Sequence, residues 1–164
     1  MVQLGLFTPE APAVGDRGTW RRVKVSDLAA RALRDRHYST KRPGGATVGP
    51  PGRRLVLVTD TQDALWITHH PDPRLVLDKV DAWRCSAFRN EGPRLSSELI
   101  REAMARTLEE WPDHLPTAGW LTYVEPGKLA SRNPGYCFLM AGWVRDRSWT
   151  DRTGRLIRLR AEGP

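Results

Sequence analysis

The stretch Ala87–Pro112 (AFRNEGPRLSSELIREAMARTLEEWP) decides the fold, because it predicts the end of a strand, a loop and a long helix in that order. In its second half, apolar residues recur every three or four positions, which is the spacing of one helical face. Ser96 or Ser97 is suited to cap the helix, and Pro112 marks its end. The apolar stripe consists of Leu99, Ile100, Ala103, Met104, Leu108 and Trp111.

Strands are predicted on both sides of this loop and helix. Upstream, the apolar runs Leu55–Val58 and Ala64–Thr68 flank a polar turn and indicate a β-hairpin, and a third extended stretch covers about 75–88. Downstream, Gly119–Val124 (GWLTYV) is a further strand. A crossover over residues 80–124 is long enough to join parallel strands, so two parallel strands are expected in the middle of the sheet.

The remaining elements have start and stop signals of their own. Helices are predicted over 26–36 and 134–141, and the second has Asn133 as its cap and Gly142 just beyond its end. Two further strands are predicted, Trp143–Trp149 and Arg155–Arg160. This order of elements predicts an α+β fold with a mixed, mostly antiparallel central sheet that is flanked by helices.

The length of 164 residues fits one domain with a tail. Residues 1–18 have little periodicity and are interpreted as a flexible N-terminal arm, which leaves 19–164 as a single domain. Residues 41–53 (KRPGGATVGPPGR) contain four Gly and three Pro, and they predict a long loop.

The chain is basic in an unusual way. Lys and Arg together number 26 against 19 Asp and Glu, a net charge of +7, and 22 of the 26 cations are Arg. Arg makes bidentate contacts with phosphate and stacks on bases, so this composition suits a nucleic-acid or phosphate partner. The alternative is a GC-rich coding bias that spreads arginines over a solvated surface.

Several classes of protein are excluded. No window approaches 18 apolar residues, which excludes a membrane span. The first 18 residues lack the pattern of a secretory signal, so a cytoplasmic location is expected. Cys85 and Cys137 are too few for a disulfide framework or a four-cysteine zinc site. His69 and His70 are adjacent and point to opposite sides of a strand, so no metal site is predicted.

The order of these elements resembles the GNAT acyltransferase superfamily over about residues 20–160. In that fold the fourth strand ends in a loop that holds the pyrophosphate of acyl-CoA. The fifth strand diverges from the fourth, and the gap accepts the pantetheine arm. The corresponding pieces here are Arg89–Arg94, the helix from Ser96, Gly119–Val124 and Ala141-Gly142-Trp143. The resemblance implies acetyl-CoA or a related acyl-CoA as cofactor.

A closer resemblance is to phage DNA-modification proteins of the Mom type, an outlying branch of that superfamily. The matching segments are His37-Tyr38-Ser39, Phe88–Glu91 (FRNE), Ser96–Ile100 (SSELI), Asn133–Phe138 (NPGYCF) and Ala141–Trp143 (AGW). This resemblance implies an enzyme of a bacterium or a phage-infected cell. It would transfer a CoA-derived acyl or carbamoylmethyl-type group to the exocyclic amine of adenine in double-stranded DNA.

The loop before the long helix is the predicted cofactor site. Free N–H groups at a helix N-terminus and the helix dipole attract anions. The loop holds one glycine where the superfamily has two or more, and Pro93 has no N–H to offer. The alternative is a solvated loop in which Arg89 pairs with Glu91. The predicted cofactor-binding residues are Arg89, Asn90, Glu91, Gly92, Arg94, Ser96, Ser97, Asn133 and Phe138.

Four residues are predicted to be catalytic: Tyr38, Arg89, Glu125 and Tyr136. In GNAT enzymes a tyrosine on the short helix protonates the departing thiolate. By spacing Phe138 takes that place, whereas the Mom-type resemblance points to Tyr136. Tyr38 ends the first helix, where it would stack on an extruded adenine or hydrogen-bond its amine. Glu125 follows a strand and would draw a proton from the attacking amine. Core packing for the tyrosines and surface charge for Glu125 are the structural alternatives.

The predicted DNA-binding residues are Lys41, Arg42, Arg53, Arg54, Arg132, Arg158 and Arg160. Arg158 and Arg160 share one face of the last strand, which either tracks phosphates or protects an edge from aggregation. Three functions stay open: an acyl-CoA-dependent DNA-modification enzyme, an N-acetyltransferase for a small amine or peptide, and a non-catalytic DNA-binding protein of the same fold. Both a monomer and a dimer are compatible with the sequence.

Overall fold

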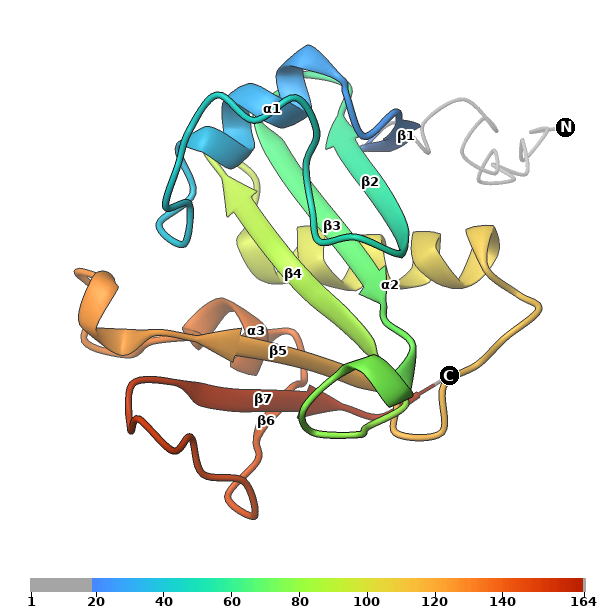
Figure 1. Cartoon of the computed structure of the whole chain (residues 1–164). Coiled ribbons are helices and arrows are strands. Elements are labelled where there is room, and N and C mark those ends of the chain that lie inside the picture. Colours follow the sequence, from blue (N-terminus) through green and yellow to red (C-terminus); the bar gives the residue numbers. More distant parts are fainter. Residues whose placement is uncertain (1–18, 164) are drawn as a thin grey trace, which may run out of the picture.

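The computed structural model describes residues 19–163, in which a seven-stranded sheet carries helices on both faces (Figure 1). The strand order is β1-β2-β3-β4-β5-β7-β6, and neighbouring strands are antiparallel except for the central pair β4 and β5. The predicted α+β class, its mostly antiparallel sheet and its parallel central pair are therefore confirmed. The predicted N-terminal arm, residues 1–18, lies outside the described residues.

The strands are β1 (Trp20–Val23), β2 (Arg53–Thr59), β3 (Ala64–His70), β4 (Trp83–Asn90), β5 (Trp120–Val124), β6 (Val144–Arg145) and β7 (Ile157–Ala161). The α-helices are α1 (Leu28–Asp35), α2 (Ser96–Glu110) and α3 (Tyr136–Met140), and two single 3₁₀ turns are η1 (Pro73–Leu75) and η2 (Pro126–Lys128). None of the helices over residues 19–163 is both long and apolar enough to span a bilayer.

Each face of the sheet has its own core. Side chains alternate along a strand, so Leu55 and Leu57 of β2 pack with α2 and α3, whereas Val56 and Val58 pack with α1 on the other face. Since both faces are covered, β2 and β3 are continuous runs of buried residues rather than alternating ones. In Figure 1, α2 passes behind the sheet and α1 lies in front of it.

Tryptophan rings fill the sheet where β4 begins. The ring centroids of Trp83 and Trp120, which face each other across the parallel pair, are 5.2 Å apart. Trp66 and Trp111 meet this pair edge-on, each at 5.9 Å. Such edge-to-face contacts add to the stabilisation that comes from burying large rings. We call the segment around Trp83–Cys85 the closed end of β4.

Beyond Cys85 and Thr122, β4 and β5 part. Their pairing covers only three residue pairs, after which β4 continues beside β3 and β5 continues beside β7 (Figure 1). A register shift marks the point of departure, because Ile67 pairs with Ala87 and Thr68 pairs with Cys85, which leaves Ser86 as an extra residue on β4. Such a bulge bends its strand and increases the local twist. We call Ser86–Asn90 the open end of β4.

Two predicted strands have different bounds in the structure. The stretch over 75–88 becomes a strand only from Trp83, and before it Leu75 and Leu77 are 84% and 103% exposed. Their apolar character misled the prediction, because neither is buried. The strand predicted over 143–149 is limited to the two residues of β6. The edge strand β1 was not predicted, since its sequence WRRV has no clear alternation.

Two helices begin at other residues than predicted. Helix α1, predicted from residue 26, begins at Leu28, and the Asp27 carboxylate caps it by accepting a hydrogen bond from the Ala30 N–H at 2.9 Å. Helix α3 starts at Tyr136 after Gly135, which has φ +80°, so Asn133 is not its cap. Glycine adopts this left-handed conformation without steric cost. Helix α2 starts at Ser96 with Leu95 at the cap position and no side-chain cap bond, so the predicted capping by Ser96 or Ser97 is wrong.

Candidate functional site

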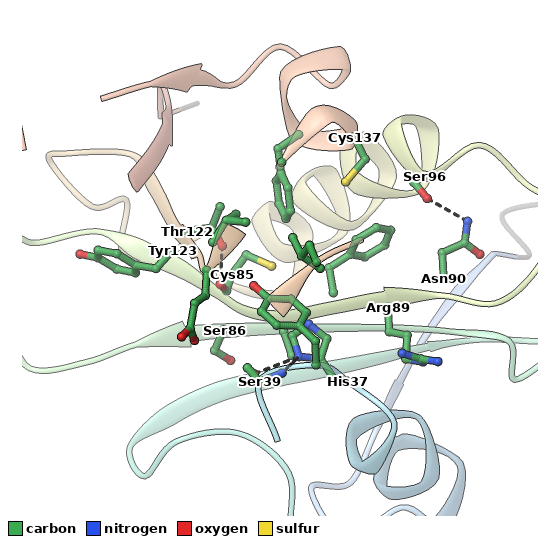
Figure 2. Close-up of a pocket in the computed structure, with 18 of the residues that line it drawn as sticks. His37, Ser39, Cys85, Ser86, Arg89, Asn90, Ser96, Thr122, Tyr123 and Cys137 are labelled. Carbon is green, nitrogen blue, oxygen red and sulfur yellow. Dashed lines mark hydrogen bonds between the residues drawn. The ribbon is translucent and has the colours of Figure 1, made fainter. Parts of the chain in front are cut away.

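The gap between β4 and β5 forms a pocket with a volume of about 530 Å³. Its walls are the open end of β4, the end of β5, the segment that follows α1, and α3 (Figure 2). The apolar part consists of Cys85, Ala87, Phe88, Val124, Leu129, Cys137, Phe138 and Leu156. A large apolar pocket with a few converging polar groups is the usual form of a small-molecule site.

The segment after α1 places three polar side chains along the pocket. His37 is 8% exposed, and its Nδ1 accepts a hydrogen bond from the Ser39 N–H at 3.2 Å, with Ser39 Oγ 2.9 Å away. A further hydrogen bond joins His37 to the backbone of Phe88 on β4. Burial and the nearby guanidinium groups of Arg34 and Arg89 lower the pKa of His37 to about 4. His37 is therefore neutral at pH 7 and ties this segment to β4.

Tyr38 reaches across the gap toward β5. It hydrogen-bonds to the backbone of Glu125, and burial raises the pKa of its phenol. The phenol therefore keeps its proton at neutral pH and is available as a proton donor. The carboxylate of Glu125 lies beside it in the pocket wall and pairs with Lys128 of η2 at 3.0 Å. A protonated phenol and a carboxylate thus lie at the same end of the pocket.

The other end of the pocket is the loop between β4 and α2. The Asn90 side chain braces it, because its Nδ2 donates to the Arg94 carbonyl at 2.8 Å and to Ser96 Oγ at 3.0 Å (Figure 2). Its Oδ1 accepts from the Gly92 N–H at 2.9 Å. The loop is therefore ordered by its own contacts.

Two guanidinium groups flank Glu91 at this end. Arg36, just after α1, forms two hydrogen bonds of 2.8 Å to the Glu91 carboxylate, and Arg89 of β4 bonds the same group. These hydrogen bonds, led by those from Arg36, lower the pKa of Glu91 to about 2. The pairing of Arg89 with Glu91 that the sequence analysis left as an alternative is present.

The structure brings some of the predicted cofactor residues to the pocket and leaves others outside. Arg89, Asn90, Ser96 and Phe138 line it. Five others do not, namely Glu91, Gly92, Arg94, Ser97 and Asn133. A Cβ at Gly92 would collide with the Asp63 carboxylate, so this glycine serves close packing. Arg94 pairs with Glu102 at 2.6 Å on the flank of α2.

The four predicted catalytic residues do not all meet. Tyr38, Arg89 and Glu125 line the pocket, whereas Tyr136 is 53% exposed and outside its lining. Tyr136 is therefore neither in the pocket nor in the core. Phe138, one half-turn further along α3, is 7% exposed and packs against Phe88 with ring centroids 6.1 Å apart.

Five of the predicted DNA-binding cations are exposed, namely Lys41, Arg42, Arg53, Arg132 and Arg160. Three of the seven, Arg53 among them, are held by contacts within the chain. Arg53 pairs with Asp113 at 3.1 Å and covers the Trp111 ring, and Arg54 donates to the carbonyls of Gly49 and Pro50. The last is Arg158, described next.

The basic outer face that was predicted for the last strand is wrong for Arg158. Its side chain is 11% exposed, pairs with the buried carboxylate of Asp146 at 2.6 Å, and lies over the Trp149 ring at 5.2 Å. Leu159 is buried and Arg160 is exposed, as the alternation predicts. Sequence alternation alone does not reveal that a loop residue, Asp146, covers this face.

Several pocket residues were not predicted as site residues. Ser86, Thr122 and Tyr123 line the pocket because they lie where β4 and β5 part. Leu129 and Leu156 enter it from loops. The only signal in the sequence for the first group is their position near the middle of two strands, which does not show where the strands separate.

Comparisons with known proteins give one structural likeness. No protein-family model matches the chain, and no curated protein matches it. The ribosomal-protein-S18-alanine N-acetyltransferase from Escherichia coli superposes with a TM-score of 0.49 and 16% sequence identity, over 86% of this chain and 90% of that one. A likeness of this size assigns neither a family nor an activity, and it does not bring the chain closer to the Mom-type proteins.

Proposed function

We propose that the protein is an acyl-CoA-dependent N-acyltransferase whose acyl donor lies in the gap between β4 and β5. The observation that carries this proposal is the separation of the two central strands after three residue pairs, with a pocket of about 530 Å³ where further pairing would be. Parallel strands that part leave backbone N–H and C=O groups facing the gap, and buried backbone groups require hydrogen-bond partners. The amides of a pantetheine arm are such partners.

The two ends of the pocket suit the two ends of an acyl-CoA molecule. At one end, the first turn of α2 and the guanidinium groups of Arg36 and Arg89 favour an anion such as a pyrophosphate. The apolar middle, with Phe88 and Phe138, suits the alkyl parts of the arm. At the other end, Tyr38 and Glu125 would flank the thioester.

Tyr38 and Glu125 have complementary tasks in this reaction. The amine nitrogen attacks the thioester carbonyl, a C–N bond forms and the C–S bond breaks. Glu125 would accept the proton that the amine loses, directly or through a water. Tyr38, whose phenol is protonated at neutral pH, would supply the proton that the departing thiolate needs. Phe138 has no proton to give, and Tyr136 is outside the pocket.

Donor binding tests the first part of the proposal. Isothermal titration with acetyl-CoA should show binding to the wild-type chain. The Arg89→Ala variant should bind about 10-fold more weakly, because it loses a charge-assisted contact to phosphate. Arg160→Ala, which removes an exposed cation of β7, is the matched control and should bind as the wild type does. No binding of any acyl-CoA to the wild-type chain would overturn the proposal.

A pair of tyrosine variants tests the catalytic assignment. Tyr38→Phe should lower kcat by about 100-fold or more, the usual effect of losing a general acid. Tyr136→Phe should leave kcat unchanged, because this hydroxyl is outside the pocket. The measurement is thiol release from acetyl-CoA with a panel of amines, including polyamines and peptides. The reverse result would move the acid role to Tyr136.

The exocyclic amine of adenine in DNA is a second candidate acceptor. The observation that favours it is that Lys41 and Arg42 follow closely after Tyr38, and that they and Arg132 are exposed cations on loops next to pocket segments. Mass spectrometry of nucleosides from DNA co-expressed with the protein tests this acceptor. Modified adenosine that disappears in Tyr38→Phe would support it, and unmodified adenosine beside turnover of another amine would exclude it.

A further inference from the structure

Two histidines and an aspartate meet next to the start of β4, and none of them lines the pocket. His70 ends β3, Asp81 precedes β4, and His114 lies in the segment that joins α2 to β5. His70 Nε2 is 2.9 Å from Asp81 Oδ1, and His114 Nε2 is 3.7 Å from the same oxygen. One ligand atom from each residue lies within 4.8 Å of the other two. Three separate segments therefore bring three ligand-type side chains to one point.

These distances fit the coordination shell of a small cation. Ligand atoms at about 2.0–2.2 Å from a tetrahedral zinc ion lie roughly 3.3 Å apart. The two separations to Asp81 Oδ1, 2.9 and 3.7 Å, lie on either side of that value. The third separation, between ligand atoms of the two histidines, is at most 4.8 Å, so side-chain movements alone would bring the three groups around a cation.

Asp81 is oriented by a neighbouring backbone group. Its second oxygen, Oδ2, accepts a hydrogen bond from the Thr117 N–H at 3.1 Å, which leaves Oδ1 toward the histidines. Ligand carboxylates and imidazoles in metal sites are commonly fixed by such outer contacts. The His70 and His114 rings also stack, with centroids 4.9 Å apart. The Asp81 carboxylate is within hydrogen-bond distance of His70 but not of His114, so a hydrogen bond to Asp81 does not explain the position of His114.

The cluster faces an open hollow and not the protein core. His70, Asp81 and His114 line a depression of about 1020 Å³ together with prolines such as Pro50 and Pro71. A fourth ligand, such as water, therefore has room. His69, the neighbour of His70 in sequence, lines the same depression, but its Nε2 bonds the Pro51 carbonyl at 2.9 Å, so His69 is not part of the cluster.

We infer that His70, Asp81 and His114 form a binding site for a divalent first-row transition-metal ion, with Zn²⁺ as the ion that fits best. Two imidazoles and one carboxylate suit zinc, and three protein ligands leave one position open to water. The site lies at the closed end of β4, whereas the pocket lies at its open end. The inference does not depend on acyl transfer. A bound ion would add a link between the end of β3, the residues before β4 and the segment that joins α2 to β5.

Zinc titration of the full chain tests the site. Calorimetry with Zn²⁺ should show one ion per chain and a higher midpoint of thermal unfolding, because a ligand that binds the folded state stabilises it. His114→Ala should weaken binding by at least about 10-fold. Its side chain is half exposed, so this variant is expected to fold normally. His69→Gln is the matched control and should bind as the wild type does. Equal affinity in His114→Ala and wild type, or no binding at all, would overturn the inference.

Cobalt substitution distinguishes this site from one built on a cysteine. Co²⁺ in the site should give visible d–d bands without the sulfur-to-metal charge-transfer band that a thiolate ligand produces. That spectrum should be lost in Asp81→Asn, while circular dichroism shows that the variant is folded. A charge-transfer band that persists in Asp81→Asn would place the ion at Cys85 or Cys137 and contradict the assignment.

Discussion

The two ends of β4 are built from different interactions. At the closed end, Trp83 is fully buried, pairs with Trp120 across the parallel strands and touches Trp111. At the open end, beyond the extra residue Ser86, the strand faces polar groups and a pocket. Apolar burial holds the sheet together at one end, and hydrogen bonds and ion pairs position groups at the other. Substitutions at the closed end should therefore lower stability through lost packing, whereas substitutions near the open end should act through charge and protonation.

The largest effect on stability is expected from the closed end. Trp83→Ala should lower the free energy of unfolding by about 3–5 kcal/mol, because it leaves a cavity among packed rings. Trp83→Phe is the matched control and should cost less than about 1.5 kcal/mol. The Trp83 indole N–H has no hydrogen-bond partner within residues 19–163, so phenylalanine gives up no such bond. Urea unfolding measures both. A similar cost for the two variants would contradict a packing origin.

The stability of β7, which pairs with β5 on the far side of the gap, should depend on a buried ion pair. Arg158→Ala should cost about 3 kcal/mol, because it leaves the buried Asp146 carboxylate without its ion-pair partner. Arg160→Ala, two residues along the same strand, should change stability by less than about 0.5 kcal/mol, since this side chain is exposed. Thermal or urea unfolding of the two variants decides the point. Equal losses of stability in the two variants would support the prediction that Arg158 and Arg160 both lie on the exposed face of the last strand.

The smallest expected effect is on the pH dependence of stability, and it comes from His37, which lies beside the open end of β4. His37 titrates at about pH 4 when folded and near pH 6.5 when unfolded, so below pH 6.5 protons favour the unfolded chain. Stability should fall by about 2 kcal/mol between pH 7 and pH 5. The Glu91 carboxylate, with a pKa of about 2, contributes a loss only below about pH 4.5.

His37→Gln provides the control for that measurement. A glutamine does not titrate, so most of the drop between pH 7 and pH 5 should disappear, with a remainder from His69, whose pKa is also lowered, chiefly by burial. Urea unfolding at several pH values gives the comparison. A slope that is unchanged in His37→Gln would show that His37 is not the group that responds.

Local patterns predicted much of the fold. The stripe from Leu99 to Trp111 predicted α2, and the two apolar runs predicted the β2–β3 hairpin, because each element buries a face whose period shows in the sequence. Leu75 and Leu77 were misread because apolar side chains can be exposed. Helix α3 was given the wrong start, because the Gly135 conformation decides its first turn.

The candidate site was harder to predict from the sequence than the fold was. Tyr38, Arg89 and Glu125 were predicted and line one pocket, but the exposure of Tyr136 depends on which side of α3 faces β5. The grouping of His70 with Asp81 and His114 has no signal in spacing, because the three residues lie on separate segments. Loops that meet only in the folded chain leave no periodic trace.

Glu91 gives the loop end of the pocket a counter-ion of its own. Its carboxylate already occupies the space between Arg36 and Arg89, so these two cations are neutralised in part before any ligand arrives. A phosphate of the proposed acyl-CoA would enter as a competitor of this internal anion, and its affinity would reflect the difference between two pairings. The same carboxylate keeps two like charges together in the free protein, so the proposed phosphate site would be arranged in advance and would discriminate against weakly charged ligands.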